Sequence, residues 1–454
     1  MKNAKKHLYQ LMTTTPDRPD FSLVERLVLY ALTFFVGCCY NYMGEYYLKV
    51  GLDDHSFVHD SFARFLIDIS SLCSSLSAVF SALLLVVIIL SLKRFPFTTF
   101  MTISLFGQFV VNVALGIEFI LFSDQNKKVY SIIFSISIVL NAICNGFFTS
   151  LNLSTFFYLA SLIGPSHIAS YLLGTSWGPF LSAFLHIGWN FAAETHDEDL
   201  DIDLLILSHF QLVSILLYIL LFFFSPSFRV TLKQDLPAEL DATESLASRT
   251  FSLLKASAAQ LRETSREIVF PIISMAITIF TTNLIFPHFL TFLPFVDDTL
   301  TENDTGVKRF HPMLVKNISF IINGTNVIGN IAAFIQMYRS ERTIMVLAVE
   351  RALFVIIPSV ITSLYGAHIF DIFYGTEVDQ TLFVVVSLFV TIILILLTFF
   401  IGLSHGYLTF LSAMQFTRKI DEKISAIVLI LSLMIPSFFA SLLQTVATVI
   451  VRAI

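Results

Sequence analysis

Long apolar runs of about 20 residues or more recur along almost the whole of this 454-residue chain. Each run is long enough for an α-helix to cross the roughly 30 Å hydrocarbon core of a bilayer. Hydrophobic residues make up 56% of the chain and charged residues only 13%, which is too little charge to cover a soluble protein of this size. The sequence therefore predicts an all-α polytopic membrane protein that lies in the lipid bilayer.

Charged breaks divide the apolar runs into eleven predicted transmembrane helices. These spans cover residues 24–48, 63–91, 95–122, 130–162, 168–193, 203–225, 267–292, 313–337, 343–365, 381–413 and 422–452. We expect four regions: a leader at 1–23, a six-span bundle at 24–225, a partly helical cytoplasmic linker at 226–266 and a five-span bundle at 267–454. This 6+5 division is typical of transporters built from two helical bundles, with the ligand near the midplane between them.

The connections between the predicted spans alternate between basic and acidic. Lys93–Arg94 and Arg339–Arg342 are basic, as are the leader and the linker, whereas 51–60 and 192–203 are mainly acidic. Because short basic loops stay in the cytoplasm, we expect a cytoplasmic N-terminus and an extracellular C-terminus. The leader carries no organelle signal, so the plasma membrane is the predicted location. Asn303 forms a sequon in an outer connection and is a candidate glycosylation site.

Several classes of function are disfavoured by motifs that the sequence lacks. There is no P-loop, no HExxH and no CxxC, so neither an ATP-driven pump nor an enzyme is indicated. The four cysteines lie inside apolar segments and are expected to be small core residues. We therefore expect no metal, no cofactor and no nucleic-acid partner.

The clearest polar feature at membrane depth is the stretch "INGTNVIGN" in the eighth predicted span. Asn323 and Asn326 are three residues apart and Asn326 and Asn330 four apart, so the three amides share one face of a helix. Each amide both donates and accepts, which suits a neutral ligand such as a sugar or a purine. The alternative is hydrogen bonding between helices, worth about 0.6–2 kcal/mol per bond. We favour a ligand path, because three amides lie on one stripe.

Other residues at membrane depth carry two interpretations each. Tyr40 and Asn41 lie deep in the first span, where an aromatic face would stack on a flat ligand, although an interfacial aromatic belt begins nearby. Pro287 breaks the seventh span, which is typical of binding regions and equally of packing kinks. A lone histidine such as His405 is more often a core residue than a ligand. Arg351 is expected to lie toward the cytoplasmic side of its bundle.

Taken in order, these segments resemble the equilibrative nucleoside transporter family. "FTTNLIFPHFL" is similar to the family's Phe-Pro in span seven, and "NGTNVIGN" occupies the place of Asn-x-x-Asp-x-x-Gly-Arg in span eight. "SERTIMVLAVERALFVIIP" resembles its Arg-x-x-Phe-x-Pro, and "SHGYL" its Ser-Asn-Gly-Tyr-Leu, with His405 in place of Asn. Tyr40–Asn41 stands where the family has Trp-Asn. The resemblance implies a major-facilitator-like fold with eleven spans, and facilitative transport of nucleosides or nucleobases by alternating access.

The resemblance also implies roles for particular residues. The implied substrate contacts are Tyr40, Asn41, Gly146, Thr149, Phe286, Pro287, Asn323, Asn326, Asn330 and His405, and the implied packing residues are Gly174, Gly178, Gly329, Arg351 and Gly406. Gly174 and Gly178 also fit the small-xxx-small spacing for close helix packing. The sequence departs from the family at Asn326 and Asn330, which replace an acid and an arginine. Losing only one of the two charges would leave an unpaired buried charge, at a cost of about 3–5 kcal/mol. Because both charges are lost together, this cost does not arise.

Two other functions stay open at the level of the sequence. One is transport of another small polar solute, such as a sugar or a vitamin, and the other is a membrane receptor that transports nothing. The neutral stripe lacks the carboxylate of the family, which would couple transport to protons. Whether transport is coupled to protons is left open. The sequence does not choose among the nucleosides and nucleobases.

Overall fold

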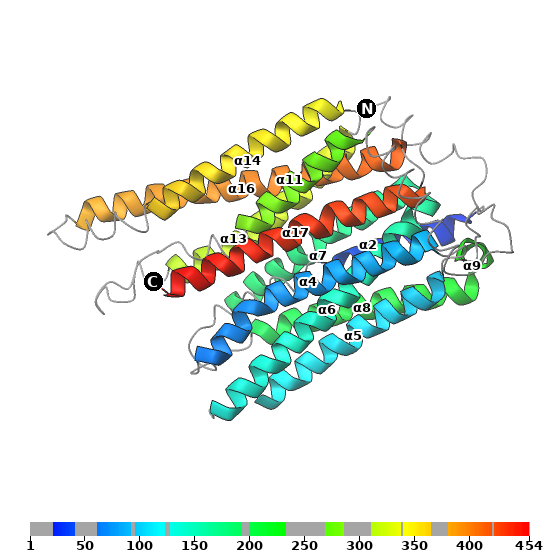
Figure 1. The fold of residues 1–454 in the computed structure, drawn as a ribbon, viewed down its shortest axis with the longest axis horizontal. Coiled ribbons are helices and arrows are strands. Elements are labelled where there is room, and N and C mark those ends of the chain that lie inside the picture. Colours follow the sequence, from blue (N-terminus) through cyan, green and yellow to red (C-terminus); the bar gives the residue numbers. More distant parts are fainter. Residues whose placement is uncertain are drawn as a thin grey trace.

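The computed structural model describes residues 21–40, 61–91, 96–122, 128–192, 199–232, 268–285, 310–336, 339–364, 380–419 and 422–453. Their regular elements are helices: α2 (Leu23–Cys38), α4 (Ser61–Ser91), α5 (Phe97–Phe122), α6 (Lys128–Ile163), α7 (Pro165–Ala192), α8 (Asp199–Phe224), α9 (Pro226–Leu232), α11 (Val269–Ile285), α13 (Phe310–Ile335), α14 (Glu341–Leu364), α16 (Gln380–Lys419) and α17 (Glu422–Ala453). The long helices run side by side along one axis (Figure 1). The all-helical prediction is confirmed.

The helix bounds lie close to the predicted spans. Six described segments are long and apolar enough to cross a membrane: Ile69–Ile89, Phe97–Ile117, Ser135–Ile163, Ile206–Phe224, Ile395–Phe416 and Ser425–Val446. Two further apolar helices, Val269–Ile285 and Phe320–Ile335, are shorter than a full crossing in their described parts. A multi-pass membrane protein is therefore confirmed, whereas the number of eleven crossings stays a prediction. The short α9 occupies the first residues of the predicted linker.

Local sequence signals explain where several helices begin and end. Ser22 and Glu25 form a capping box at the start of α2: Glu25 N–H donates to Ser22 Oγ at 3.3 Å, and Ser22 N–H donates to Glu25 Oε2 at 2.7 Å. Gly164 separates α6 from α7 with a φ of 149°, a conformation that favours glycine. Pro165 then opens α7 at the first helical position, where its missing N–H costs nothing.

The two predicted bundles meet along two seams. α4 packs against α17 at one seam and α7 packs against α13 at the other. The hydroxyls of Ser75 and Ser441 are 2.8 Å apart across the first seam. Helices far apart in the sequence are thus brought together where a ligand site between bundles is expected.

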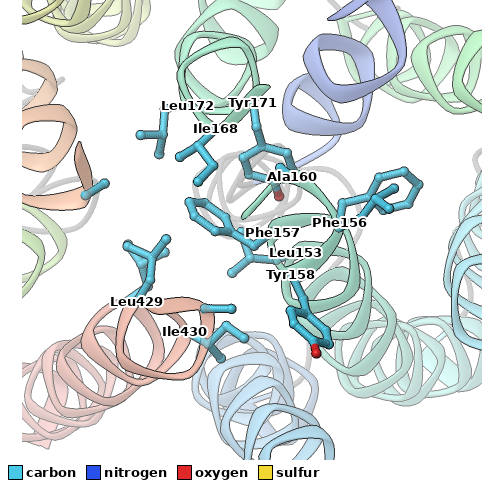
Figure 2. Close-up of a cluster of buried hydrophobic side chains, with 14 of the residues drawn as sticks. Leu153, Phe156, Phe157, Tyr158, Ala160, Ile168, Tyr171, Leu172, Leu429 and Ile430 are labelled. Atoms are coloured by element: carbon cyan, nitrogen blue, oxygen red, sulfur yellow. The ribbon is translucent and has the colours of Figure 1, made fainter. Parts of the chain in front are cut away.

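A cluster of buried apolar side chains closes one end of the space between the bundles. We call this the inner end, because α6 ends there and α7 and α17 begin there. Leu153 and Phe157 of α6 pack with Leu172 of α7 and with Leu429 and Ile430 of α17 (Figure 2). All five side chains are buried, so apolar contact seals the bundles at this end.

Candidate functional site

A cavity of about 190 Å³ lies between the two bundles. The first bundle contributes Tyr40, Ser71, Ser74, Ser75, Ala78, Asn145, Gly146, Thr149, Ser150, Thr175 and Pro179, and the second contributes Thr282, Asn283, Ile322, Asn323, Asn326, Gly402, His405, Met434, Ser437, Ser441 and Gln444. At roughly 15 Å³ per water this space holds on the order of a dozen waters, enough for one small solute.

The chemistry of the lining is polar and uncharged. None of the described lining residues is an aspartate, glutamate, lysine or arginine, whereas most of them carry a hydroxyl or a carboxamide. Such groups donate and accept hydrogen bonds at once. The cavity therefore suits a neutral solute that carries both donors and acceptors.

The structure brings six of the ten predicted substrate contacts to this one cavity. They are Tyr40, Gly146, Thr149, Asn323, Asn326 and His405. Asn330 instead lines an adjoining cavity of about 50 Å³, together with Tyr40, Asn326, His405 and nine other residues. The remaining predicted contacts, Asn41, Phe286 and Pro287, lie outside the described residues, as does the candidate glycosylation site Asn303. The assignment of these residues to substrate binding stays a prediction.

The asparagine stripe of α13 divides between two environments. Asn323 and Asn326 line the larger cavity, and Asn326 Oδ1 is a buried acceptor with no hydrogen bond. Asn330 is 3% exposed, and its Nδ2 donates to Ser176 Oγ at 2.5 Å and to the Leu172 carbonyl at 3.4 Å. The two interpretations of the stripe therefore apply to different residues. Asn323 and Asn326 face the cavity, as a ligand path requires, whereas Asn330 forms a hydrogen bond between helices, across the seam to α7.

A network of three asparagines fixes one side chain of the cavity wall. Asn145 Nδ2 donates to Asn112 Oδ1 at 2.9 Å and to Asn141 Oδ1 at 2.7 Å, while Asn141 Nδ2 donates to the Val111 carbonyl at 3.0 Å. Both N–H groups of Asn145 are therefore used within the wall. Its Oδ1 is buried without a partner, at a residue that lines the cavity. An unpaired buried acceptor costs about 1–3 kcal/mol, which a donating ligand would offset.

A second network positions Thr149. Gln108 Nε2 donates to Thr149 Oγ1 at 3.0 Å and lies 3.4 Å from the Cys39 carbonyl, next to Tyr40. Asn152 Nδ2 donates to Gln108 Oε1 at 3.1 Å. Because Gln108 contacts both α6 and the end of α2, it holds Thr149 and Tyr40 on the same wall of the cavity.

His405 is part of a polar cluster inside the second bundle. Its Nδ1 is 2.8 Å from Thr282 Oγ1, and Thr282 in turn accepts a hydrogen bond from Arg351 Nη2. Arg351 also binds Ser404 Oγ and Thr281 Oγ1. The predicted packing residue Arg351 therefore lies behind the cavity wall, one side chain away from the solute space.

Glycines permit close helix contacts on both sides of the cavity. A Cβ at Gly174 or Gly178 of α7 would overlap the backbone of Phe34 or Cys38 at the end of α2. On the other side, Gly329 of α13 lies against the Leu403 carbonyl, and Gly406 of α16 lies against the Asn326 backbone. These contacts set the spacing of the helices that present Tyr40, Asn326 and His405.

Sequence reasoning missed a serine stripe on α4. Ser71, Ser74 and Ser75, with Ala78, line the cavity at i, i+3, i+4 and i+7. The same spacing test that selected the asparagines of α13 would have found it in "SSLCSSLSA". On α17, Ser437, Ser441 and Gln444 follow the same rule. Asn141, Asn145 and Thr149 on α6 also carry this signal at i, i+4 and i+8, but the orientation of the Asn145 amide depends in addition on Asn112 of α5.

Comparison with known proteins shows the fold. No protein-family model matches the chain, and no curated protein matches it. The proton:xylose symporter XylE bound to 6-bromo-6-deoxy-D-glucose has a TM-score of 0.55 at 12% identity, covering 92% of this chain and 86% of that one. A partially occluded inward-open XylE from E. coli gives 0.54 at 11% identity, covering 92% and 91%. The nucleoside transporter NupG gives 0.44 at 14% identity, covering 93% and 90%, a likeness that carries no conclusion for this chain.

The chain therefore has the major facilitator fold, in which two helical bundles face each other. This confirms the two-bundle arrangement predicted from the apolar runs. With an uncharged cavity between the bundles, the fold and the site define a multi-pass membrane protein of the architecture found in solute transporters.

Proposed function

We propose that this chain is a facilitative transporter of nucleosides and nucleobases that works by alternating access. The observation that carries the proposal is the cavity itself, which is uncharged in its described lining, polar, and enclosed between two bundles that meet at a sealed inner end. The motifs that resemble the equilibrative nucleoside transporters line this cavity from α11, α13 and α16 and from the residues after α2. They supply Tyr40, Asn323, Asn326 and His405.

The lining suits the chemistry of a nucleoside. Tyr40 offers an aromatic face on which a flat base would stack. Asn323 and Asn326 on one wall and Asn145 and Thr149 on the other offer donors and acceptors for base edges and ribose hydroxyls. Asn145 Oδ1 and Asn326 Oδ1 are buried acceptors without a partner, and a solute that did not donate to them would leave them unpaired at a cost of about 1–3 kcal/mol each. Selectivity then follows from the match of donors and acceptors.

Alternating access requires the two seams to open in turn. In this structure the cluster around Leu429 and Phe157 and the Asn330–Ser176 hydrogen bond close the inner end. In the proposed cycle these contacts separate when the bundles rock about the bound solute, which then leaves through the inner end. In the predicted topology, the inner end faces the cytoplasm. The predicted location of the protein is the plasma membrane.

The test is uptake into liposomes that contain the purified protein. We expect radiolabelled adenosine or hypoxanthine to equilibrate without an energy source, and glucose to equilibrate no faster than in empty liposomes. Asn326→Leu should lower the uptake, because it removes an acceptor and leaves an apolar group in the cavity. Ile328→Ala, on the exposed side of the same helix, is the matched control and should leave uptake unchanged. Absence of both uptake and binding of purines would refute the proposal.

A sugar is the second candidate solute, favoured by the hydroxyl-rich wall that Ser71, Ser74 and Ser75 form on α4. Hydroxyl groups pair readily with the hydroxyls of a hexose. The glucose arm of the same experiment separates the two solutes. Binding of purines without any equilibration across the membrane would instead support the receptor alternative.

A further inference from the structure

Arg351 is a buried cation that the transport scheme above does not use. It lies on α14, is 5% exposed, and directs its guanidinium at α11 and α16. Nε donates to Ser404 Oγ at 2.8 Å, and Nη1 donates to the Thr278 carbonyl at 2.6 Å and to Thr281 Oγ1 at 2.9 Å. Nη2 binds Thr282 Oγ1 and, at 3.4 Å, the Ile401 carbonyl.

All these partners are neutral oxygens. They satisfy the five N–H donors of the guanidinium, so the group is well hydrogen-bonded, but they do not cancel its charge. No carboxylate is bonded to Arg351 within the part of the chain that the structure describes. An arginine side chain is always protonated in proteins. A full positive charge therefore lies inside the second bundle.

This charge is close to the solute space. Thr282 lines the cavity and is hydrogen-bonded directly to Arg351, and His405 lines the cavity on the other side of Thr282. The Thr282 hydroxyl is bonded to Arg351, to His405 and to the Thr278 carbonyl. A solute in van der Waals contact with the Thr282 side chain would lie roughly 6 Å from the guanidinium. Two like charges at that separation, with an effective dielectric constant of about 20, repel strongly enough to change binding by about 100-fold.

We propose that Arg351 is a specificity-determining residue that excludes cationic solutes from the cavity. The inference rests on the proposed transport of nucleosides and narrows the substrate class to neutral ones. Arg351 acts through its field and not by contact with the solute. The described lining has no carboxylate that would offset this field.

The alternative is that Arg351 has only a structural role and stabilises the packing of α11, α14 and α16. Substitution would then lower stability without changing the ratio at which neutral and cationic solutes compete. Two variants separate the effect of the charge from the effect of the hydrogen bonds. Arg351→Lys keeps the charge and loses most of the hydrogen bonds, whereas Ser404→Asp keeps the arginine and places a carboxylate beside Nε. Ser404 is not among the described lining residues.

The experiment measures inhibition of labelled adenosine uptake in liposomes by two probes. Nicotinamide riboside carries a permanent positive charge, and its reduced dihydro form, which differs by one hydride, is neutral. We expect the cationic form to inhibit about 100-fold more weakly than the neutral form in the unaltered protein. Arg351→Gln and Ser404→Asp should each reduce that ratio to below about 10-fold, and Arg351→Lys should retain it.

The outcomes are distinct. Equal inhibition by the two probes in the unaltered protein, or an unchanged ratio in Ser404→Asp, would overturn the inference while adenosine uptake still supported the proposed function. If Arg351→Gln fails to fold, Ser404→Asp and Arg351→Lys still decide the question. If adenosine is not taken up at all, the proposed function fails, and the inference fails with it.

Discussion

Removing the amide of Asn330 should loosen the inner end of the seam between α7 and α13. Asn330 Nδ2 donates to Ser176 Oγ at 2.5 Å and to the Leu172 carbonyl at 3.4 Å, and both partners belong to the other bundle. The side chain is 3% exposed, so bulk water has little access to these bonds while the end is closed. Asn330→Ala deletes both bonds and leaves Leu172 and the rest of the apolar seal in place.

The size of the effect follows from the value of a hydrogen bond between membrane helices. Such bonds average about 0.6 kcal/mol and reach about 1.7 kcal/mol. The 2.5 Å bond to Ser176 belongs at the upper end, and the 3.4 Å contact adds little. The substitution should therefore destabilise the closed state by about 1–2 kcal/mol, and it should leave the stability of the open state unchanged. This shifts the equilibrium toward an open inner end by about 5- to 30-fold.

Labelling of a cysteine placed at Thr409 measures this shift. Thr409 is 9% exposed and lines the smaller cavity beside Asn330, behind the sealed inner end. In inside-out vesicles, a membrane-impermeant thiol reagent should label Thr409→Cys about 5- to 30-fold faster when Asn330→Ala is also present. The chain without the Thr409 substitution gives the background from native cysteines. Ile331→Ala, at an exposed neighbouring position, is the matched control and should leave the labelling rate unchanged.

A double-mutant cycle sharpens the interpretation. Ser176→Ala should reproduce most of the effect, and the two substitutions together should add little, because they remove the same bond. If Asn330 contacts only the solute, as the stripe alone suggested, the labelling rate without solute will not change and affinity will fall from both sides of the membrane. That result would refute the assignment of Asn330 to the closed inner end.

Three further results are expected. Asn112→Leu should weaken competition by adenosine about 5-fold at unchanged surface expression, because Asn145 loses a partner that orients its amide, a loss of about 1 kcal/mol. Gly406→Val should lower the melting temperature of the detergent-solubilised protein, because its Cβ meets the Asn326 backbone, and Gly406→Ala should do so less. Adenosine uptake should not respond to a potassium diffusion potential of about 100 mV, which acts with about 2.3 kcal/mol on each charge moved. A potential-dependent rate would show that charge moves with the solute.

The helices were predictable from the sequence, because a chain in lipid must satisfy its backbone hydrogen bonds within each span. The starts of α7 and α8 were placed three or four residues late, at 168 and 203. Hydropathy marks where a helix enters lipid, whereas Pro165 and Asp199 continue the helix into the polar region beyond it. Hydropathy alone also does not fix the number of crossings, because the described apolar parts of α11 and α13 are short.

The site was predictable only in part, for a geometric reason. Spacing along one helix identified Asn323 and Asn326, since both face the cavity from α13. Spacing did not show that Asn330, on the same stripe, meets Ser176, because that partner lies 154 residues away in the sequence. Asn145 depends in the same way on Asn112 of α5. Roles that depend on a partner from another helix require the tertiary structure.

The neutral asparagines of α13 acquire a physical meaning from their place at the seam. In the proposed transport cycle, opening the inner end breaks the hydrogen bonds that join Asn330 to α7, so the strength of those bonds would set how often the inner end opens. A neutral bond there contributes about 1–2 kcal/mol, whereas parting one member of a buried ion pair from the other costs about 3–5 kcal/mol. The difference corresponds to at least a fivefold change in the open population. The buried Arg351 makes its hydrogen bonds to α11 and α16 of the second bundle, so the proposed opening of the seam would leave these bonds in place. With neutral groups at the seam and the Arg351 charge within the second bundle, the proposed separation of the bundles would not part an ion pair among the described residues.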